Sequence, residues 1–276
     1  MPNAKDLDLT KLGKPKFLLV GSTGSGKTSQ ILTLPGKTFA YLFDPSSLST
    51  LRGFDIEYEM FVPEVVNLAA HSLTKDKGDQ KTQIADAHEV YKKWESDYEE
   101  KAKKGFFTNI DNILFDSFTT FADIVMDRIL YINNRAGRWP QQDDWTAQMS
   151  TIRNVVRTLT GQQGMVLVCT AHDQIRQDEV TTRILNQIML TGQLRAKLPL
   201  LFSDIWHMSC DSKKDVIKYT AQTRPDFMNP TVRCSFQDLD MFHDVTIGDW
   251  KNPQNFGIGK LLKNRGYYAT QQEKVA

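Results

Sequence analysis

Eight residues at 21–28, Gly-Ser-Thr-Gly-Ser-Gly-Lys-Thr, have the spacing G-x-x-x-x-G-K-[ST]. This spacing is typical of a loop that binds nucleotide phosphates. Glycines let the backbone curl until successive N–H groups point at phosphate oxygens, and a following helix adds the positive end of its dipole. The pattern predicts that Lys27 reaches the β- and γ-phosphates and that the Thr28 hydroxyl is a ligand of Mg²⁺. The sequence thus predicts a nucleoside triphosphate site.

The neighbourhood of this loop supports that interpretation. Residues 17–20 are an apolar run that predicts a buried strand, and residues 29–32 predict the first turn of a helix. A strand, a loop and a helix in this order are the context that the motif requires. The expected nucleotide-binding residues are Gly21, Ser22, Thr23, Gly24, Ser25, Gly26, Lys27, Thr28 and Ser29.

A second contribution to the metal site is expected further along the chain. Residues 112–115, Asn-Ile-Leu-Phe, predict a buried strand, and Asp116 follows directly. In magnesium-dependent nucleotide enzymes, an acidic residue at the end of such a strand helps to hold the metal. Thr28 and Asp116 are therefore the two expected metal residues.

The strand predicted at 164–170 ends in polar side chains, Thr170, His172 and Asp173. Because parallel sheets bind ligands at the carboxyl ends of their strands, these three residues are expected to face the nucleotide. His172 has two interpretations. It is either a sensor of the γ-phosphate that influences the following loop, or a histidine satisfied by a local backbone carbonyl.

The rest of the chain alternates between apolar runs and amphipathic segments. Further strands are expected at 38–43 and 216–221, and helices at 85–104, 118–133 and 145–160. Strands that alternate with helices predict an α/β fold, a mostly parallel sheet with helices on both faces.

The domain organisation follows from this pattern. Residues 1–245 are expected to form one ATPase domain, in which the charged helix at 85–104 is an insertion. Residues 246–276 are expected to be a peripheral tail. The polar stretches at 72–83 and 174–192 show no clear periodicity and are expected to be loops.

The composition of the 276 residues is that of a soluble globular protein, with 40% hydrophobic and 24% charged residues. The formal net charge of +1 means that any nucleic-acid surface must be a local patch. Cys169, Cys210 and Cys234 lack the spacing of a zinc site and fit a reducing compartment. The first residues contain no apolar signal segment, and no run is long enough to span a bilayer. A cytoplasmic protein that does not bind membranes is expected.

Other classes of nucleotide protein fit less well. The sequence contains no N-K-x-D, and residues 116–119 lack the glycine of a D-x-x-G switch, which disfavours a guanine-nucleotide switch protein. A small-molecule kinase with a phosphate loop is harder to exclude, although no arginine-rich lid is evident. The sequence also lacks a G-x-S-x-G elbow and an H-E-x-x-H zinc helix.

The order of these parts resembles the RecA-type core and, more closely, the phage-encoded minimal RecA/RadA-like ATPases. Some of those proteins act in single-strand annealing recombination. The resemblance covers about residues 15–235, and only the phosphate loop is highly specific. Besides that loop, it depends on the segments 113–119, 168–173, 198–206 and 222–226.

The resemblance implies ATP as the nucleotide with Mg²⁺, work on DNA, and assembly of copies of the chain into filaments or rings. For a phage protein it also implies the host cytoplasm. RecA-type enzymes often complete the nucleotide site with a basic residue of a neighbouring subunit, and Arg224 and Arg233 are the candidates. The expected catalytic residues are Lys27, Asp116, His172, Arg224 and Arg233.

One position departs from the family pattern. RecA-type enzymes carry a water-activating glutamate in the turn after the second strand, and Ser46 stands there in this chain. Serine is not a general base at neutral pH without an activating neighbour. Asp44, Glu57 and Glu59 are candidate replacements. Otherwise hydrolysis is slow, and the alternatives are a nucleotide-gated binding protein without motor activity, a helicase loader or a packaging ATPase.

The resemblance also implies single-stranded DNA as a partner of the loop at 174–192. This segment carries Arg176 and Arg183, and Arg195 and Lys197 follow it. A γ-phosphate sensor at its start is expected to set the order of the loop and thus its affinity for DNA phosphates. The alternative is an ordinary solvated loop whose basic charges are balanced by acidic neighbours.

Overall fold

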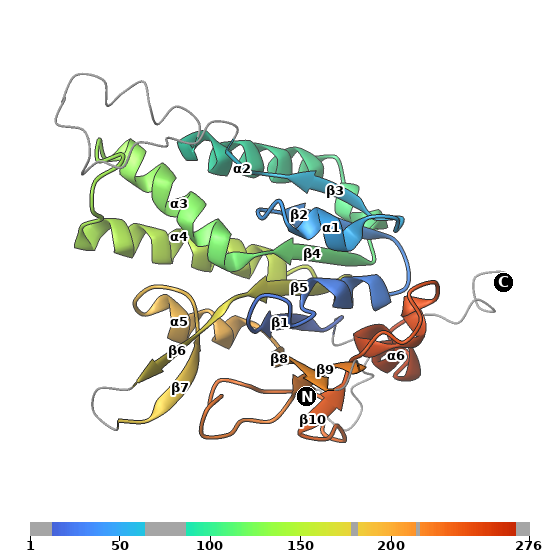
Figure 1. Ribbon diagram of the computed structural model, residues 1–276. Helices are drawn as coiled ribbons and strands as arrows, with labels where there is room; N and C mark the ends of the chain where they lie inside the picture. The colour runs from blue at the N-terminus through green and yellow to red at the C-terminus, as the bar shows by residue number, and fades with distance from the viewer. Residues whose placement is uncertain (1–12, 64–86, 178–181, 214–215, 269–276) are drawn as a thin grey trace, which may run out of the picture.

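The elements of the chain alternate between strands and helices (Figure 1). The computed structural model describes residues 13–63, 87–177, 182–213 and 216–268. The strands are β1 (Lys16–Val20), β2 (Thr38–Leu42), β3 (Glu57–Met60), β4 (Asn112–Asp116), β5 (Val166–Ala171), β6 (Asp173–Gln177), β7 (Ile184–Ile188), β8 (Asp204–Lys213), β9 (Val216–Gln222) and β10 (Phe242–Asp244). The α-helices are α1 (Ser47–Leu51), α2 (Ala87–Lys103), α3 (Phe118–Ile132), α4 (Gln142–Thr160), α5 (Leu194–Lys197) and α6 (Gly257–Asn264). The 3-10 helices are η3 (Thr28–Thr33), η4 (Phe106–Asn109), η5 (Pro199–Leu201) and η6 (Pro253–Asn255).

Eight of these strands form one sheet in the order β10-β9-β8-β1-β5-β4-β2-β3. Strand β1 pairs in parallel with β5 and β8, and β4 pairs in parallel with β5 and β2. Antiparallel pairing is confined to the edge formed by β8, β9 and β10. The predicted α/β fold with a mostly parallel sheet is confirmed. The carboxyl ends of β1, β2, β4 and β5 consequently meet at one edge of the sheet.

Both faces of the sheet are covered, as Figure 1 shows, with α2, α3 and α4 on one face and α6 on the other. Successive side chains of a strand point to opposite faces. Leu18 and Val20 of β1 belong to the core beneath α2, α3 and α4, whereas Phe17 and Leu19 belong to the core that includes η3 and α6. This alternation fixes β1, and with it the start of the phosphate loop, between two packed layers.

Helix α2 is part of the layer on the first face. Its buried residues Val90 and Trp94 belong to the core, and the Trp94 ring centroid lies 4.9 Å from that of Phe121. Charged pairs such as Glu99 with Lys103 are on its exposed side. The predicted charged segment therefore forms a helix with one apolar face that packs on the sheet.

The segment expected as an irregular loop at 174–192 is instead a β-hairpin. Strands β6 and β7 are antiparallel, with Ile175 opposite Asn186 and Gln177 opposite Ile184. The prediction of an irregular loop is wrong because the strands satisfy each other's backbone groups without an apolar pattern. Ile175 is 74% exposed, so hydrophobic periodicity gives little signal here.

The prediction of a peripheral tail after residue 245 is also wrong for the described part of that segment. Ile258 and Leu262 of α6 are fully buried in the second core. The Gln30 side chain of η3 donates to the carbonyl of Val245 at 3.0 Å. The tail is packed against η3 because α6 has a strongly apolar side that covers the open face of the sheet.

Some expectations fall on residues that the structure does not describe. These are the loop predicted at 72–83, the first two residues of the helix predicted at 85–104, and the tail from residue 269 onward. Within the described ranges, no helix has both the length and the apolar character needed to cross a bilayer.

Candidate nucleotide-binding site

The phosphate loop forms one wall of a cavity of about 580 Å³ at the carboxyl edge of the sheet. The opposite walls come from the segment after β2, the ends of β4 and β5, strand β9, and the segment after β10. The lining residues include Lys27, Thr28, Asp44, Ser46, Ser47, Asp116, His172, Tyr219 and Trp250. The structure thus brings together the predicted loop with Asp116 and His172.

The loop needs glycine at two positions. Gly24 and Gly26 have φ values of 79° and 82°, a region that favours glycine over residues with a side chain. At Gly26 a Cβ atom would also lie 2.7 Å from the ring of Tyr219. Tyr219 therefore packs closely on the loop at Gly26, where a side chain would not fit.

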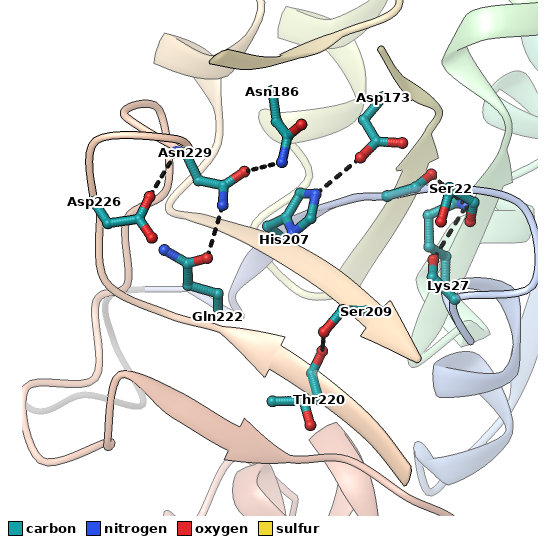
Figure 2. Close-up of polar contacts among 12 residues, drawn as sticks. Ser22, Lys27, Asp173, Asn186, His207, Ser209, Thr220, Gln222, Asp226 and Asn229 are labelled. Atoms are coloured by element: carbon teal, nitrogen blue, oxygen red, sulfur yellow. Dashed lines mark hydrogen bonds and ion pairs between the residues drawn. The ribbon is translucent and has the colours of Figure 1, made fainter. Parts of the chain in front are cut away.

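Lys27 is buried, and its ammonium group folds back onto the loop (Figure 2). Its Nζ donates to the carbonyl oxygens of Gly21 and Ser22, both at 2.8 Å. Burial lowers the pKa of Lys27, although the charges of Asp116 and Asp173 oppose this shift. A phosphate in the loop would give this buried ammonium group an anionic partner in addition to its carbonyl partners.

Asp116 accepts hydrogen bonds from three hydroxyl groups. Thr28 and Ser47 both donate to its Oδ2 at 2.7 Å, and Thr170 donates to its Oδ1. The two predicted metal residues, Thr28 and Asp116, are therefore in direct contact. Hydroxyl and carboxylate oxygens are ligands that Mg²⁺ prefers, so this cluster fits a magnesium ion beside the phosphate loop.

Ser47 is the member of this cluster that the sequence did not reveal. It is the first residue of α1, directly after the position where a glutamate was expected. Leu42 is paired with Asp116 in the sheet, so the turn that follows β2 ends above the carboxylate. No local sequence signal marks Ser47, because its contact with Asp116 depends on the pairing of β2 with β4.

His172 lines the cavity between the end of β5 and the start of β6. Its backbone N–H donates to the hydroxyl of Thr119 at 2.9 Å, and its carbonyl accepts from the N–H of Met189 at 2.7 Å. Burial and the charge of Lys27 lower the pKa of its imidazole. A neutral imidazole at pH 7 is consistent with a phosphate-sensing role, which stays a prediction.

Ser46 lies in the cavity wall, as does one of its three proposed replacements. Asp44 lines the cavity, and its Oδ1 accepts from the N–H of Ser46 at 2.9 Å. Glu57 and Glu59 are on β3 instead, where they pair with Lys37 at 2.8 Å and Lys101 at 3.2 Å. Asp44 is therefore the best placed of the three carboxylates to activate water.

The two arginines predicted to act on a neighbouring subunit do not line the cavity of their own chain. The Arg224 guanidinium donates to the carbonyls of Phe236 and Gln237, both at 2.8 Å. Arg233 has an exposed side chain, and its backbone pairs with Ile205. Action on a second subunit stays a prediction, and Arg233 is the more accessible of the two.

Arg176 of the hairpin lies close to a basic residue of α5, Arg195. Arg176 and Gln187 lie on the same side of the β6–β7 pair, and Arg195 donates to Gln187 at 2.9 Å. Burial and the charge of Arg176 lower the pKa of Arg195, which reflects their proximity. Arg183 and Lys197 are exposed. Arg176 and Arg195 thus form one basic pair beside the hairpin.

Polar contacts hold both strands of the hairpin to the body of the protein (Figure 2). Asp173 of β6 pairs with His207 of β8 at 2.9 Å. Asn186 of β7 donates to Asn229 at 3.1 Å, and Asn229 donates to Gln222 of β9 at 2.8 Å. Burial acts to raise the pKa of Asp173, but the hydrogen bond and charge of His207, together with the charge of Lys27, lower it overall. The hairpin is therefore coupled to the strands that flank the phosphate loop.

The AAA domain family matches residues 13–231 of this chain. The comparison with curated proteins gives no match. Among solved structures, the flagellar accessory protein FlaH from Methanocaldococcus jannaschii is similar, with 12% identity and a TM-score of 0.38 over 89% of this chain and 93% of that chain. The family match spans most of the sequence and contains the phosphate loop, Asp116 and His172. The chain belongs to the AAA domain family.

Proposed function

We propose that this protein binds ATP with Mg²⁺ at the loop 21–28 and hydrolyses it. The 2.7 Å contact between Thr28 and Asp116 supports this most strongly, because it joins the loop hydroxyl to a strand-end carboxylate. Lys27 and the loop N–H groups would hold the phosphates, and Thr28 and Asp116 would hold the metal or its water shell. Bound Mg²⁺ would neutralise charge on the β- and γ-phosphates.

The test is ATP binding in the presence of Mg²⁺, measured by calorimetry. Lys27→Ala is expected to abolish binding because it removes the buried cation at the phosphate position. Lys37→Ala, which removes an exposed lysine outside the cavity, is the matched control. Asp116→Asn is expected to impair hydrolysis more than binding. Unchanged ATP affinity in folded Lys27→Ala protein would rule out this site.

Hydrolysis by the isolated protein is expected to be slow. Ser46 lines the cavity where a water-activating glutamate would stand. The alternative to a slow ATPase is a nucleotide-gated binding protein without motor activity. Turnover at or below about 1 s⁻¹ is expected without a stimulating partner. Fast turnover by the protein alone would show that another carboxylate supplies the base, and would exclude the alternative.

We further propose single-stranded DNA as the partner, in recombination or strand annealing of the phage type. The hairpin begins one residue after His172 and presents Arg176 beside Arg195. A change at the γ-phosphate would reach the hairpin through this short connection and alter its affinity for DNA phosphates. Helicase loading and DNA packaging are the competing roles for the same core.

The DNA proposal is tested by single-strand affinity with and without a non-hydrolysable ATP analogue. Wild-type binding is expected to rise with the analogue and to fall steeply with salt. The double variant Arg176→Ala/Arg183→Ala is expected to lose most of it. Lys103→Ala/Lys104→Ala removes two exposed charges from the region of α2 and is the control. Equal affinities in all measurements would favour a DNA-independent ATPase.

A further inference from the structure

Some residues that line the nucleotide cavity differ in their chemistry from the phosphate loop and Asp116. Besides those groups, the lining includes Arg52, Phe54 and Trp250. Trp250 is 51% exposed, a large fraction for an indole. We propose that Trp250 is the residue that stacks on the base of the bound nucleotide. This inference depends on the proposed ATP site and assigns the part of the ligand that the phosphate loop does not contact.

The backbone around Trp250 is held to the element that follows the phosphate loop. On one side of Trp250, the Gln30 side chain donates to the carbonyl of Val245 at 3.0 Å. On the other side, the N–H of Gly259 donates to the Thr33 hydroxyl at 2.9 Å. Both contacts are buried and both are made to η3. The segment from 245 to 259 therefore bridges two fixed points and places Trp250 at the cavity.

The turn that carries Trp250 is itself ordered by its neighbours. The Asp249 carboxylate accepts from the N–H of Lys251 at 2.9 Å and from the side chain of Asn252 at 2.8 Å. A side chain that closes such a turn fixes the local backbone. The indole is therefore presented by a pre-organised turn, which reduces the entropy lost when a ligand packs on it.

Two other lining residues are also suited to a flat aromatic ligand. Phe54 packs partly against the second core and lines both this cavity and the neighbouring one, to which Lys251 also contributes. Arg52 is exposed and carries a planar guanidinium, a group that stacks on aromatic faces. Aromatic rings bind bases through their faces. The lining thus combines groups that suit an anionic ligand with groups that suit a flat aromatic ring, as a nucleotide requires.

The experiment compares ATP with inorganic tripolyphosphate, which carries the phosphates but no base. Binding of each with Mg²⁺ is measured by calorimetry for wild type, Trp250→Ala and Trp250→Phe. Trp250→Ala is expected to weaken ATP binding about tenfold or more, since stacking on one aromatic ring contributes that much. Tripolyphosphate binding is expected to stay the same. Trp250→Phe is expected to recover most of the ATP affinity.

A matched control and a second readout accompany these measurements. Trp139 is 92% exposed and does not line the cavity, so Trp139→Ala is expected to change neither affinity. The chain has five tryptophans, and ATP is expected to quench fluorescence in wild type but not in Trp250→Phe. Tripolyphosphate is expected to cause no such quenching.

The outcomes separate this inference from the proposed function. Equal loss of ATP and tripolyphosphate affinity in Trp250→Ala would overturn the stacking role, as would unchanged ATP affinity. In both cases the ATP site would stand if Lys27→Ala still abolished binding. If wild type bound neither ligand, the proposed function itself would fail, and the assignment of Trp250 with it.

Discussion

Asp116 accepts hydrogen bonds from three hydroxyl groups of three different elements, and this arrangement predicts a role for Ser47 in metal binding. If Thr28 is a ligand of bound Mg²⁺, Ser47 would remain as a donor that orients the same carboxylate oxygen, Oδ2. Ser47→Ala is expected to raise the Mg²⁺ concentration needed for half-maximal ATP binding roughly tenfold, as loss of an outer partner of a ligand commonly does.

The measurement is a Mg²⁺ titration at fixed ATP. Thr158→Ala, which also removes a hydroxyl but lies on α4 outside the cavity, is expected to behave as wild type. Ser47→Thr keeps the donor and is expected to restore part of the affinity. If Ser47→Ala had the wild-type Mg²⁺ requirement, the hydroxyl would have no part in holding the metal site.

Asp44 is expected to activate the attacking water in place of the missing glutamate. Asp44→Asn keeps the size of the side chain and removes its basicity, so hydrolysis is expected to fall about 10²- to 10⁴-fold while ATP affinity changes little. Single-turnover hydrolysis and binding are measured side by side. Glu57→Gln, on the exposed strand β3, is the control. A loss confined to Glu57→Gln would transfer the role to that residue.

At the residue level, the sequence predicted what its local spacing determines. Lys27 and Thr28 follow from one contiguous motif, and Asp116 from its place at the end of an apolar strand. Ser47 and Trp250 were not predicted because each reaches the cavity through long-range packing. Ser47 depends on the pairing of β2 with β4, and Trp250 on the docking of the 245–259 segment onto η3.

Among the elements, helix α4 begins three residues earlier than its apolar pattern predicted, and a buried carboxylate accounts for the difference. Asp144 accepts from the N–H of Gln141 at 2.8 Å and from the side chain of Asn133 at 2.7 Å, and it also pairs with Arg135. The hydrogen bond from Arg135 is the main reason that the pKa of Asp144 falls to about 2. This carboxylate both caps α4 and joins it to the end of α3.

Asp144→Ala is expected to destabilise the protein by roughly 2–4 kcal/mol at pH 7, because it removes a helix cap and leaves Arg135 without its carboxylate. Since the folded pKa lies below the unfolded value near 3.8, the contribution of the Asp144 carboxylate is complete above about pH 5 and is lost as the pH falls through the folded pKa of about 2. Denaturant unfolding at several pH values measures this. Asp143→Ala, one residue earlier and exposed, is expected to change stability little, and an equal loss in both variants would contradict the role of Asp144.

Strands β6 and β7 show why some elements cannot be predicted from the sequence. Strands in a core are indicated by apolar runs in the sequence, as for β1, β4 and β5. Strands β6 and β7 carry mostly polar side chains and are held from outside, through Asp173 with His207 and Asn186 with Asn229. Such contacts join residues far apart in the chain, so local periodicity does not reveal them.

For the whole molecule, we expect copies of the chain to assemble so that Arg233 completes the nucleotide site of a neighbouring subunit. If Arg233 acts on a neighbouring subunit, ATPase activity is expected to rise more steeply than linearly with protein concentration. A mixture of Arg233→Ala and Lys27→Ala proteins is expected to regain activity, because each supplies what the other lacks. Absence of recovery, with a monomer at all concentrations in ATP, would reject a shared site.

Arg224→Ala is the informative comparison for that experiment. Its guanidinium holds backbone carbonyls of its own chain, so its removal is expected to lower stability by roughly 1–3 kcal/mol. Arg233→Ala is expected to leave the stability unchanged. The overall α/β architecture was predictable because strands and helices alternate along the sequence. The predicted domain boundary at residue 245 was wrong because the apolar side of α6 packs against η3, a contact between residues far apart in the chain.

The contact between α6 and η3 has a consequence for the synthesis of the protein. Gly259 donates to Thr33 across 226 positions of sequence, and a Cβ at 259 would overlap the Thr33 carbonyl oxygen. A nascent chain therefore carries its phosphate loop long before the segment that backs it has left the ribosome. Chains stalled before residue 245 should not be retained on immobilised ATP, whereas released chains should be. Nucleotide capture would then mark the point at which the segment 245–264 has docked on η3.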